Sequence, residues 1–226
     1  MSVFKPVIYD GSLQRQLYPG DVLGGAEVIT NNATVGSTTL PASQLISGIL
    51  NRTGSTGVFT DTTDTAANII AALVAQYSYQ QSPTNGLAGG NAVQPGLSVR
   101  LRYINAVAFA ATIAAGTGVT LGANSATVNA SSVKDYLLQV TNGTPQQTFA
   151  VNQTNGSAVL TGLTQFQTAQ LSVGQLVTGS GLSGNIISIQ SGVGVTLSAN
   201  ASSTLILNAA TFSPTVTITG LGQGLL

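Results

Sequence analysis

From residue 97 onward, apolar and polar residues alternate with the period of two that is typical of β-strands with one buried face. The segment LSVRLRYIN shows this pattern clearly, with Leu97, Val99, Leu101 and Tyr103 on one face. Further short segments of the same kind, among them SSVKDYLLQVTN and SPTVTITG, are separated by Gly, Asn and Pro. Many short strands divided by turn residues predict an antiparallel β-sandwich, a jelly-roll-like fold or a barrel over residues 97–226.

The preceding part of the chain has a different pattern. Residues 26–75 predict a small α+β module with two short helices, in the segments TTLPASQLISGIL and FTDTTDTAANIIAALVA. In the second segment, Ile69, Ile70 and Leu73 have helical spacing. The whole protein is therefore expected to be mainly β, with two short helices in this module.

Asp61 and Asp64 lie three residues apart at the start of this second helix. Two carboxylates in such proximity can act as a general acid and base, provided that a nucleophile or a metal ion lies nearby. The alternative is a structural role, in which Asp64 or Thr65 accepts hydrogen bonds from the free N–H groups of the first turn. Because the chain contains no His or Cys, we expect Asp64 to be a helix cap and the protein not to be an enzyme.

Residues 1–25 read as an extended arm, because Pro and Gly interrupt any helical period. The arm is too apolar to lie free in water, so it packs either on its own domain or along a partner. The residues expected at a capsid or subunit interface are Phe4, Val7, Ile8, Tyr9, Leu17, Tyr18 and, from the following module, Arg52. Residues 76–96 are rich in Gly, Gln, Asn and Pro and predict a linker or loop.

Composition narrows the range of functions. The 226 residues include six Lys and Arg and six Asp and Glu, with no Cys and no His. Disulfides and thiolate metal sites are therefore impossible, and the zero net charge does not favour capture of nucleic acid or of an anionic membrane. From Tyr136 to Leu226 there is no Asp, Glu, Lys or Arg. This stretch is rich in Val, Leu, Ile and Thr, which predicts folded β-structure rather than disorder.

The few charged residues of the β-region offer one candidate cluster. Arg100 and Arg102 lie on the same face of one predicted strand, and Asp135 lies on another. The two arginines could contact an anion, pair across strands with Asp135, or form ion pairs across a subunit interface. The glycine-rich segments GTGVTLG and GSGLSGN lack the Lys-Ser/Thr of a phosphate loop, so no cofactor is expected.

The stretch STTLPASQLISGILNRTGSTGVFTDTTDTAANIIAALVA, followed by LSVRLRYINAVAFAATIAAGTGVTL and VKDYLLQVTN, resembles the capsid decoration (cement) and head-fibre proteins of tailed bacteriophages. The resemblance covers residues 36–142. It implies a non-catalytic homotrimer without a cofactor, bound to the major capsid protein on the outer surface of the virion. The arm and the 26–75 module would then contact the capsid.

A second resemblance covers residues 163–210. The segment LSVGQLVTGSGLSGNIISIQSGVGVTLSANASSTLIL is similar to a small β-module of phage tail fibres, although the run from Gly179 to Asn185 lacks the usual Pro. It predicts a β-module inserted at about 155–210, after which the parent domain resumes at FSPTVTITGLGQG. The alternative function that it implies is a tail-fibre or adhesin-type module that binds a host glycan.

Overall fold

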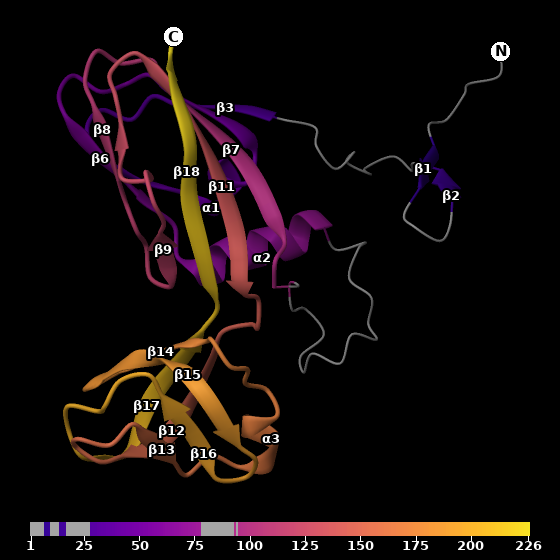
Figure 1. Cartoon of the computed structure of the whole chain (residues 1–226), viewed down its shortest axis with the longest axis vertical. Helices are drawn as coiled ribbons and strands as arrows, with labels where there is room; N and C mark the ends of the chain where they lie inside the picture. The colour runs from indigo at the N-terminus through magenta and orange to yellow at the C-terminus, as the bar shows by residue number, and fades with distance from the viewer. Residues whose placement is uncertain (1–6, 10–13, 17–27, 78–92, 94) are drawn as a thin grey trace.

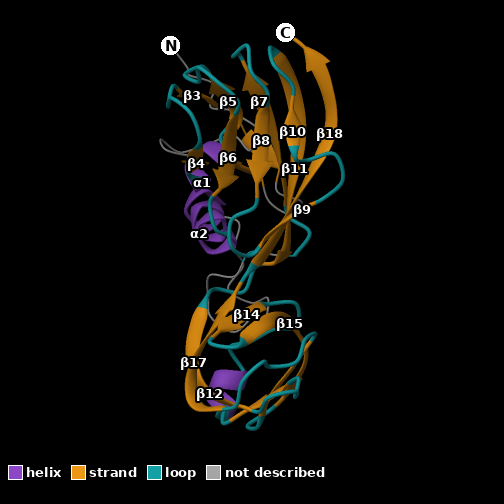
Figure 2. Ribbon diagram, turned by 90° about the vertical axis from the view of Figure 1, so that its left-hand side faces the viewer, coloured by secondary structure: helices purple, strands orange, loops and turns teal. Residues whose placement is uncertain are grey.

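The computed structural model describes residues 7–9, 14–16, 28–77, 93 and 95–226 (Figure 1). Its described part is mainly β, as the sequence predicts, and it forms a β-sandwich and a separate closed barrel (Figures 1 and 2). Each lobe has its own cluster of buried apolar side chains. Within the first residues of the chain, β1 (Val7–Tyr9) pairs antiparallel with β2 (Gln14–Gln16).

The larger sheet of the sandwich has six strands. In spatial order they are β3 (Val28–Asn32), β5 (Gly48–Arg52), β7 (Ser98–Asn105), β11 (Ser132–Asn142), β18 (Thr215–Leu225) and β9 (Val119–Leu121). The first three strands are parallel to one another, and β9 is parallel to β18. Only β11 pairs antiparallel with both of its neighbours.

The smaller sheet has four strands. In spatial order they are β10 (Thr127–Val128), β8 (Ala111–Ala114), β6 (Phe59–Thr63) and β4 (Thr38–Leu40). Here β8, β6 and β4 are parallel. The sandwich is thus mixed rather than antiparallel, because connections that pass through α1 (Ala42–Leu45) and α2 (Ala66–Tyr77) allow parallel pairing.

The 26–75 segment is not a separate α+β module. Its strands β3 and β5 enter the larger sheet, and β4 and β6 enter the smaller one. Ile69, Ile70 and Leu73 of α2 are buried in the same core as Leu101 and Tyr103 of β7. The sequence pattern identifies which residues of each strand are buried, but it does not identify the strand with which each one pairs.

The barrel is inserted between β11 and β18, which are neighbours in the larger sheet. It comprises β12 (Gln147–Gln153), β13 (Val159–Thr161), α3 (Gln165–Thr168), β14 (Leu176–Gly179), β15 (Leu182–Gln190), β16 (Gly194–Leu197) and β17 (Leu205–Ser213). The inserted unit is longer than the predicted 155–210, because β12 pairs with β17 and closes the barrel. The segment QQTFAVN, which precedes the predicted insertion, therefore belongs to the barrel.

Candidate functional site

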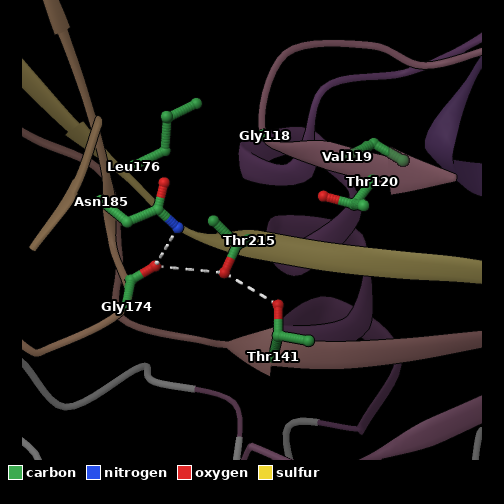
Figure 3. Close-up of a pocket in the computed structure, with 8 residues that line it drawn as sticks. All are labelled: Gly118, Val119, Thr120, Thr141, Gly174, Leu176, Asn185 and Thr215. Carbon is green, nitrogen blue, oxygen red and sulfur yellow. Dashed lines mark hydrogen bonds between the residues drawn. The ribbon is translucent and has the colours of Figure 1, made fainter. Parts of the chain in front are cut away.

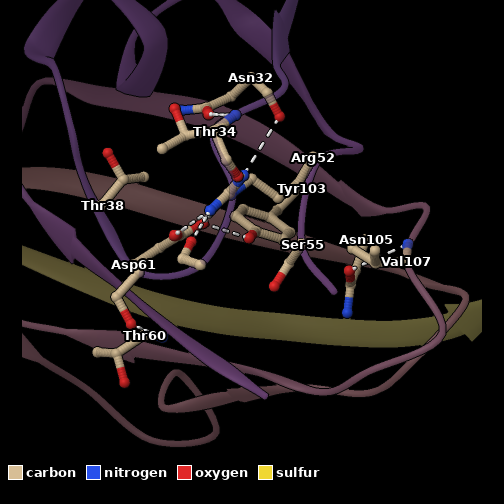
Figure 4. Close-up of polar contacts among 12 residues, drawn as sticks. Asn32, Thr34, Thr38, Arg52, Ser55, Thr60, Asp61, Tyr103, Asn105 and Val107 are labelled. Atoms are coloured by element: carbon tan, nitrogen blue, oxygen red, sulfur yellow. Dashed lines mark hydrogen bonds and ion pairs between the residues drawn. The ribbon is translucent and has the colours of Figure 1, made fainter. Parts of the chain in front are cut away.

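A buried ion pair lies inside the sandwich (Figure 4). The Nε of Arg52 on β5 donates to Oδ2 of Asp61 on β6 at 2.9 Å, and its Nη2 donates to Oδ1 at 3.2 Å. Tyr103 on β7 donates its hydroxyl to the same Oδ2 at 2.6 Å. Both charged side chains have no exposed surface, so the cluster joins strands of the two sheets within the closed core.

The remaining donors of Arg52 are also occupied. Its Nη1 donates to the backbone oxygens of Asn32, at 3.4 Å, and of Thr34, and its Nη2 donates to the backbone oxygen of Gly36. The guanidinium carbon lies 4.7 Å from the ring centre of Phe59. The guanidinium thus fixes the turn between β3 and β4 against the core of the sandwich.

The burial of Arg52 and Asp61 bears on two predictions made from the sequence. Arg52 was expected at an interface, but its side chain is enclosed within its own chain. Asp61 accepts three hydrogen bonds and is closed to solvent, so it has no access to a substrate as one half of an acid–base pair. Burial, followed by the negative charge of Asp61, raises the pKa of Tyr103 far above its ordinary value, which keeps its hydroxyl protonated as a donor.

Asp64 connects the starts of two helices. Its Oδ2 accepts the backbone N–H of Ala42, the first residue of α1, at 3.0 Å. Its Oδ1 accepts the backbone N–H of Thr65 at 2.8 Å and the Asn68 side-chain amide at 2.7 Å. Burial favours the neutral acid, but the bonds from Asn68, Thr65 and Ala42 outweigh it and lower the pKa of Asp64.

The side-chain cap of α2 is Thr65 rather than Asp64. The Oγ1 of Thr65 accepts the backbone N–H of Asn68 at 3.2 Å, which is the bond expected of an N-cap residue. Asp64 stands one position earlier, where its carboxylate can reach across to α1. The local sequence permits either residue as the cap, and the packing of α1 beside α2 decides between them.

Arg100 and Arg102, both exposed on β7, lie opposite different residues of β11. Arg102 lies opposite Asp135 in the β7–β11 pairing, and its Nε donates to Oδ1 of Asp135 at 2.9 Å. The hydrogen bond from Arg102 lowers the pKa of Asp135, burial opposes this effect, and the positive charges of Arg102 and Arg100 add to it. Arg100 lies opposite Leu137. The structure therefore contains the cross-strand pair rather than a clustered anion site.

The candidate interface residues of the arm lie largely beyond what the structure describes. Phe4, Leu17 and Tyr18 are outside the described residues, and Val7–Tyr9 are described only as the backbone of β1. Most of the linker expected at 76–96 is also outside them. Val93 is described and buried, and its N–H donates to the backbone oxygen of Gly143 at 3.2 Å.

A groove of about 490 Å³ lies where the two lobes meet (Figure 3). It is lined by Gly118, Val119, Thr120, Thr141, Gly174, Leu176, Asn185 and Thr215. Thr141 donates to the Thr215 hydroxyl at 2.8 Å, and Thr215 and Asn185 both donate to the backbone oxygen of Gly174 at 3.4 Å. These lining groups have no formal charge and bond largely to one another, so the groove is a neutral, hydrogen-bonded seam between the two lobes.

Asn142, at the end of β11, holds the barrel against this seam. Its buried side-chain amide donates to the Ser172 hydroxyl and to the backbone oxygen of Val173, both at 2.8 Å. Its Oδ1 accepts the N–H of Thr144 at 2.9 Å. Nothing in the local sequence distinguishes Asn142 from other Asn-Gly positions, so this role becomes visible only when the barrel loop meets the strand end.

The barrel surface combines neutral polar groups with scattered apolar side chains. Strands and loops from 147 to 213 contain no Asp, Glu, Lys or Arg. Phe166 on α3 is 76% exposed, and α3 begins with a reciprocal cap between Thr164 and Gln167. Phe149 and Phe212, by contrast, contact each other with ring centres 5.8 Å apart. Phe149 is partly buried, so Phe166 is the most exposed aromatic side chain of the barrel.

Two further observations concern the described part of the chain. Within it, no group of three or more His, Cys, Asp and Glu side chains is placed to hold a metal ion. Its helices are also all too short or too polar to span a bilayer.

Comparison with known proteins gives little further information. No family model matches this chain, and no curated protein matches its sequence. Among solved structures, it is similar to a Phage phi92 endosialidase with 20% sequence identity, over 42% of this chain and 17% of that chain. The TM-score is 0.21, so the likeness carries no argument about the fold or activity of this protein.

Proposed function

We propose that this protein is a non-catalytic structural component of a tailed-phage virion. In this proposal it decorates the outer surface of the capsid as a homotrimer, bound to the major capsid protein, and stabilises the shell. The proposal rests first on the sequence resemblance over residues 36–142. A non-catalytic role is compatible with the structure, because the carboxylates of Asp61 and Asp64 both accept hydrogen bonds from groups within the fold.

The observation that carries the proposal is the position of the uncharged barrel. The barrel leaves the sandwich between two neighbouring strands and returns after Ser213, so it adds a lobe without interrupting the sheet. Its core is its own, and its surface has no formal charge. A lobe of this kind suits the exposed side of a permanent coat, while the sandwich and the arm face the shell.

The capsid contact would then depend on apolar area rather than on charge. The arm residues Phe4 to Tyr18 are the candidates for this contact, together with exposed apolar residues of the sandwich such as Val28, Ile29 and Val58. Large obligate interfaces are more apolar than transient ones, so an uncharged surface is suited to them. The same arm would serve the contacts of the trimer.

The copy number in the virion tests this proposal. Quantitative mass spectrometry of purified virions would give the ratio of this protein to the major capsid protein. A ratio near a simple fraction of the shell subunits is expected for a decoration protein. A few copies per particle would contradict it and would instead indicate a tail or fibre.

A second candidate function is recognition of a host glycan by the barrel. It is favoured by the exposure of Phe166, since an aromatic ring can stack on the apolar face of a sugar. Replacement of Phe166 by Ala would abolish binding on a glycan array if this candidate is correct. The matched control is Val173→Ala, which removes another exposed apolar side chain of the barrel. Binding that survives Phe166→Ala, or no binding by the unaltered protein, would exclude this site.

A further inference from the structure

One strand of the larger sheet is paired along only part of its outer edge. β18 pairs with β11 from Thr215 to Leu225, whereas β9 covers only Val216–Ile218 on the opposite side. The N–H of Gly220 still donates to the backbone oxygen of Ala123 at 3.2 Å. From Leu221 to Leu225, no described strand pairs with this edge, which stands at the side of the sandwich above β9 (Figure 2).

This free stretch has one bulge, at Leu221, and otherwise lacks the usual protection of an edge strand. Proteins generally guard such edges with charged side chains, Pro or strong bulges. Here the segment 215–226 has neither charge nor Pro. The register shift at Leu221 precedes the regular pairing of Gly222 to Leu225. Leu221 is 48% exposed and Leu225 is 89% exposed, while an added Cβ at Gly222 or Gly224 would meet only open space.

The sequence of the stretch reads the same in both directions. Residues 221–225 are Leu-Gly-Gln-Gly-Leu, centred on Gln223. Two such strands placed antiparallel about a twofold axis put Gln223 opposite itself and Gly222 opposite Gly224 of the second copy. Leu221 then meets Leu225 of the second copy. A twofold contact requires self-complementary surfaces, and an uncharged palindromic strand meets this requirement without repulsion.

We propose that β18 is a docking edge for a second copy of this chain. Antiparallel pairing of the two 221–225 segments joins two six-stranded sheets into one continuous sheet. The two β9 strands do not obstruct this pairing, because each flanks Val216–Ile218 of its own copy, beyond the five paired residues. The contact is separate from capsid binding and from the homotrimer, and it links neighbouring trimers if both exist.

Other occupants fit the edge less well. The opposite edge of the sheet is β3, which is parallel to β5 and has the sequence Val-Ile-Thr-Asn-Asn. Addition of β3 to β18 would also be head-to-tail, and it would build open chains of molecules rather than closed pairs. Growth of such chains with concentration would therefore contradict the proposal.

A charge-swap experiment tests the pairing in the purified full-length protein. Gln223→Lys and Gln223→Glu each place two like charges opposite each other, so each variant should weaken self-association at least about tenfold in sedimentation equilibrium. An equimolar mixture of the two variants should recover the lost affinity. Gln139→Lys is the matched control, since Gln139 is exposed on β11 but paired on both sides. It should change nothing.

A cysteine experiment gives an independent reading. The chain has no Cys, so Gln223→Cys introduces a single thiol whose only equivalent is on another copy. Directly opposed residues of antiparallel strands lie at distances that a disulfide can bridge. Mild oxidation should give a band at twice the 22.7 kDa chain mass, and Gln139→Cys should not.

Two results would overturn the proposal. One is self-association that is unchanged in both charge variants, and the other is failure of Gln223→Cys to cross-link under conditions in which its thiol is accessible to a small reagent. Both experiments use isolated protein and are independent of virion copy number. Failure of the docking edge is therefore distinguishable from failure of the decoration role.

Discussion

Arg52 and Asp61 form an ion pair across the two sheets of the sandwich, with 2.9 Å between Nε and Oδ2 and with neither side chain exposed. Asp61→Asn would leave the guanidinium buried without its counter-charge. Removal of one partner from a buried pair typically costs about 3–5 kcal/mol. We expect a loss of this size in the free energy of unfolding, measured by urea denaturation followed by circular dichroism.

The double variant Arg52→Met with Asp61→Leu provides the control for this prediction. It removes both charges, so it should be less destabilised than Asp61→Asn alone. A loss below about 1 kcal/mol in Asp61→Asn would show that the pair is not closed to water, since exposed pairs contribute no more than this. The expected destabilisation also affects any test of catalysis, because a loss of activity in Asp61→Asn would reflect unfolding.

The surface pair of Arg102 and Asp135 should behave differently. It joins β7 and β11 on the exposed face of the sheet, where solvent and salt screen the charges. Asp135→Asn should therefore lower the free energy of unfolding by at most about 1 kcal/mol, and by less in high salt. A loss of stability as large as that of Asp61→Asn would contradict the conclusion that this pair is exposed to solvent.

The start of α2 offers a test of capping. Thr65→Ala removes the hydroxyl that accepts the N–H of Asn68, so it should cost about 0.5–2 kcal/mol in thermal or urea unfolding. Thr65→Ser retains the hydroxyl and is the matched control. If both variants lose the same stability, the effect comes from the missing methyl group and not from the cap.

The stability of the sandwich should fall in acid. The pKa values of Asp64 and Asp135 are both lowered from 3.8 in the folded state. A lowered folded pKa gives stability that is fully present above the ordinary value and is lost as the pH falls through the folded value. We expect the melting temperature to decrease below about pH 4. The variant with both Asp64→Asn and Asp135→Asn should show a shallower decrease, and an unchanged slope would contradict this origin.

The barrel should be dispensable for folding of the sandwich. Asn142 of β11 and Thr215 of β18 are paired, so a short turn can replace residues 143–214. The shortened chain should retain β-sheet circular dichroism and a cooperative melting transition, because the core of the sandwich contains no barrel residue. Loss of cooperative unfolding would show that the bonds from Asn142 to the barrel are essential to the fold.

Local sequence predicts part of the candidate site well. The alternation in LSVRLRYIN correctly indicates burial of Leu101 and Tyr103, and it places Arg102 on the opposite face of the strand. The partner of Arg102, Asp135, is set by the pairing of β7 with β11. The sequence does not show that Arg52 is enclosed. An arginine in a turn-rich segment is ordinarily solvated, and its burial depends on Asp61, Tyr103 and three backbone oxygens supplied by the folded chain.

The sequence by itself determined that this protein is mainly β, that it lacks thiol and imidazole chemistry, and that its last part is uncharged. These properties follow from composition and from the period of side chains along each strand. Only the tertiary structure decided that strands before and after the 76–96 segment share one sandwich, that β12 belongs to the barrel, and that no strand of the described residues pairs with the outer edge of β18 beyond Gly220. Strand pairing depends on contacts between distant segments, and a strand's own pattern does not encode its neighbour.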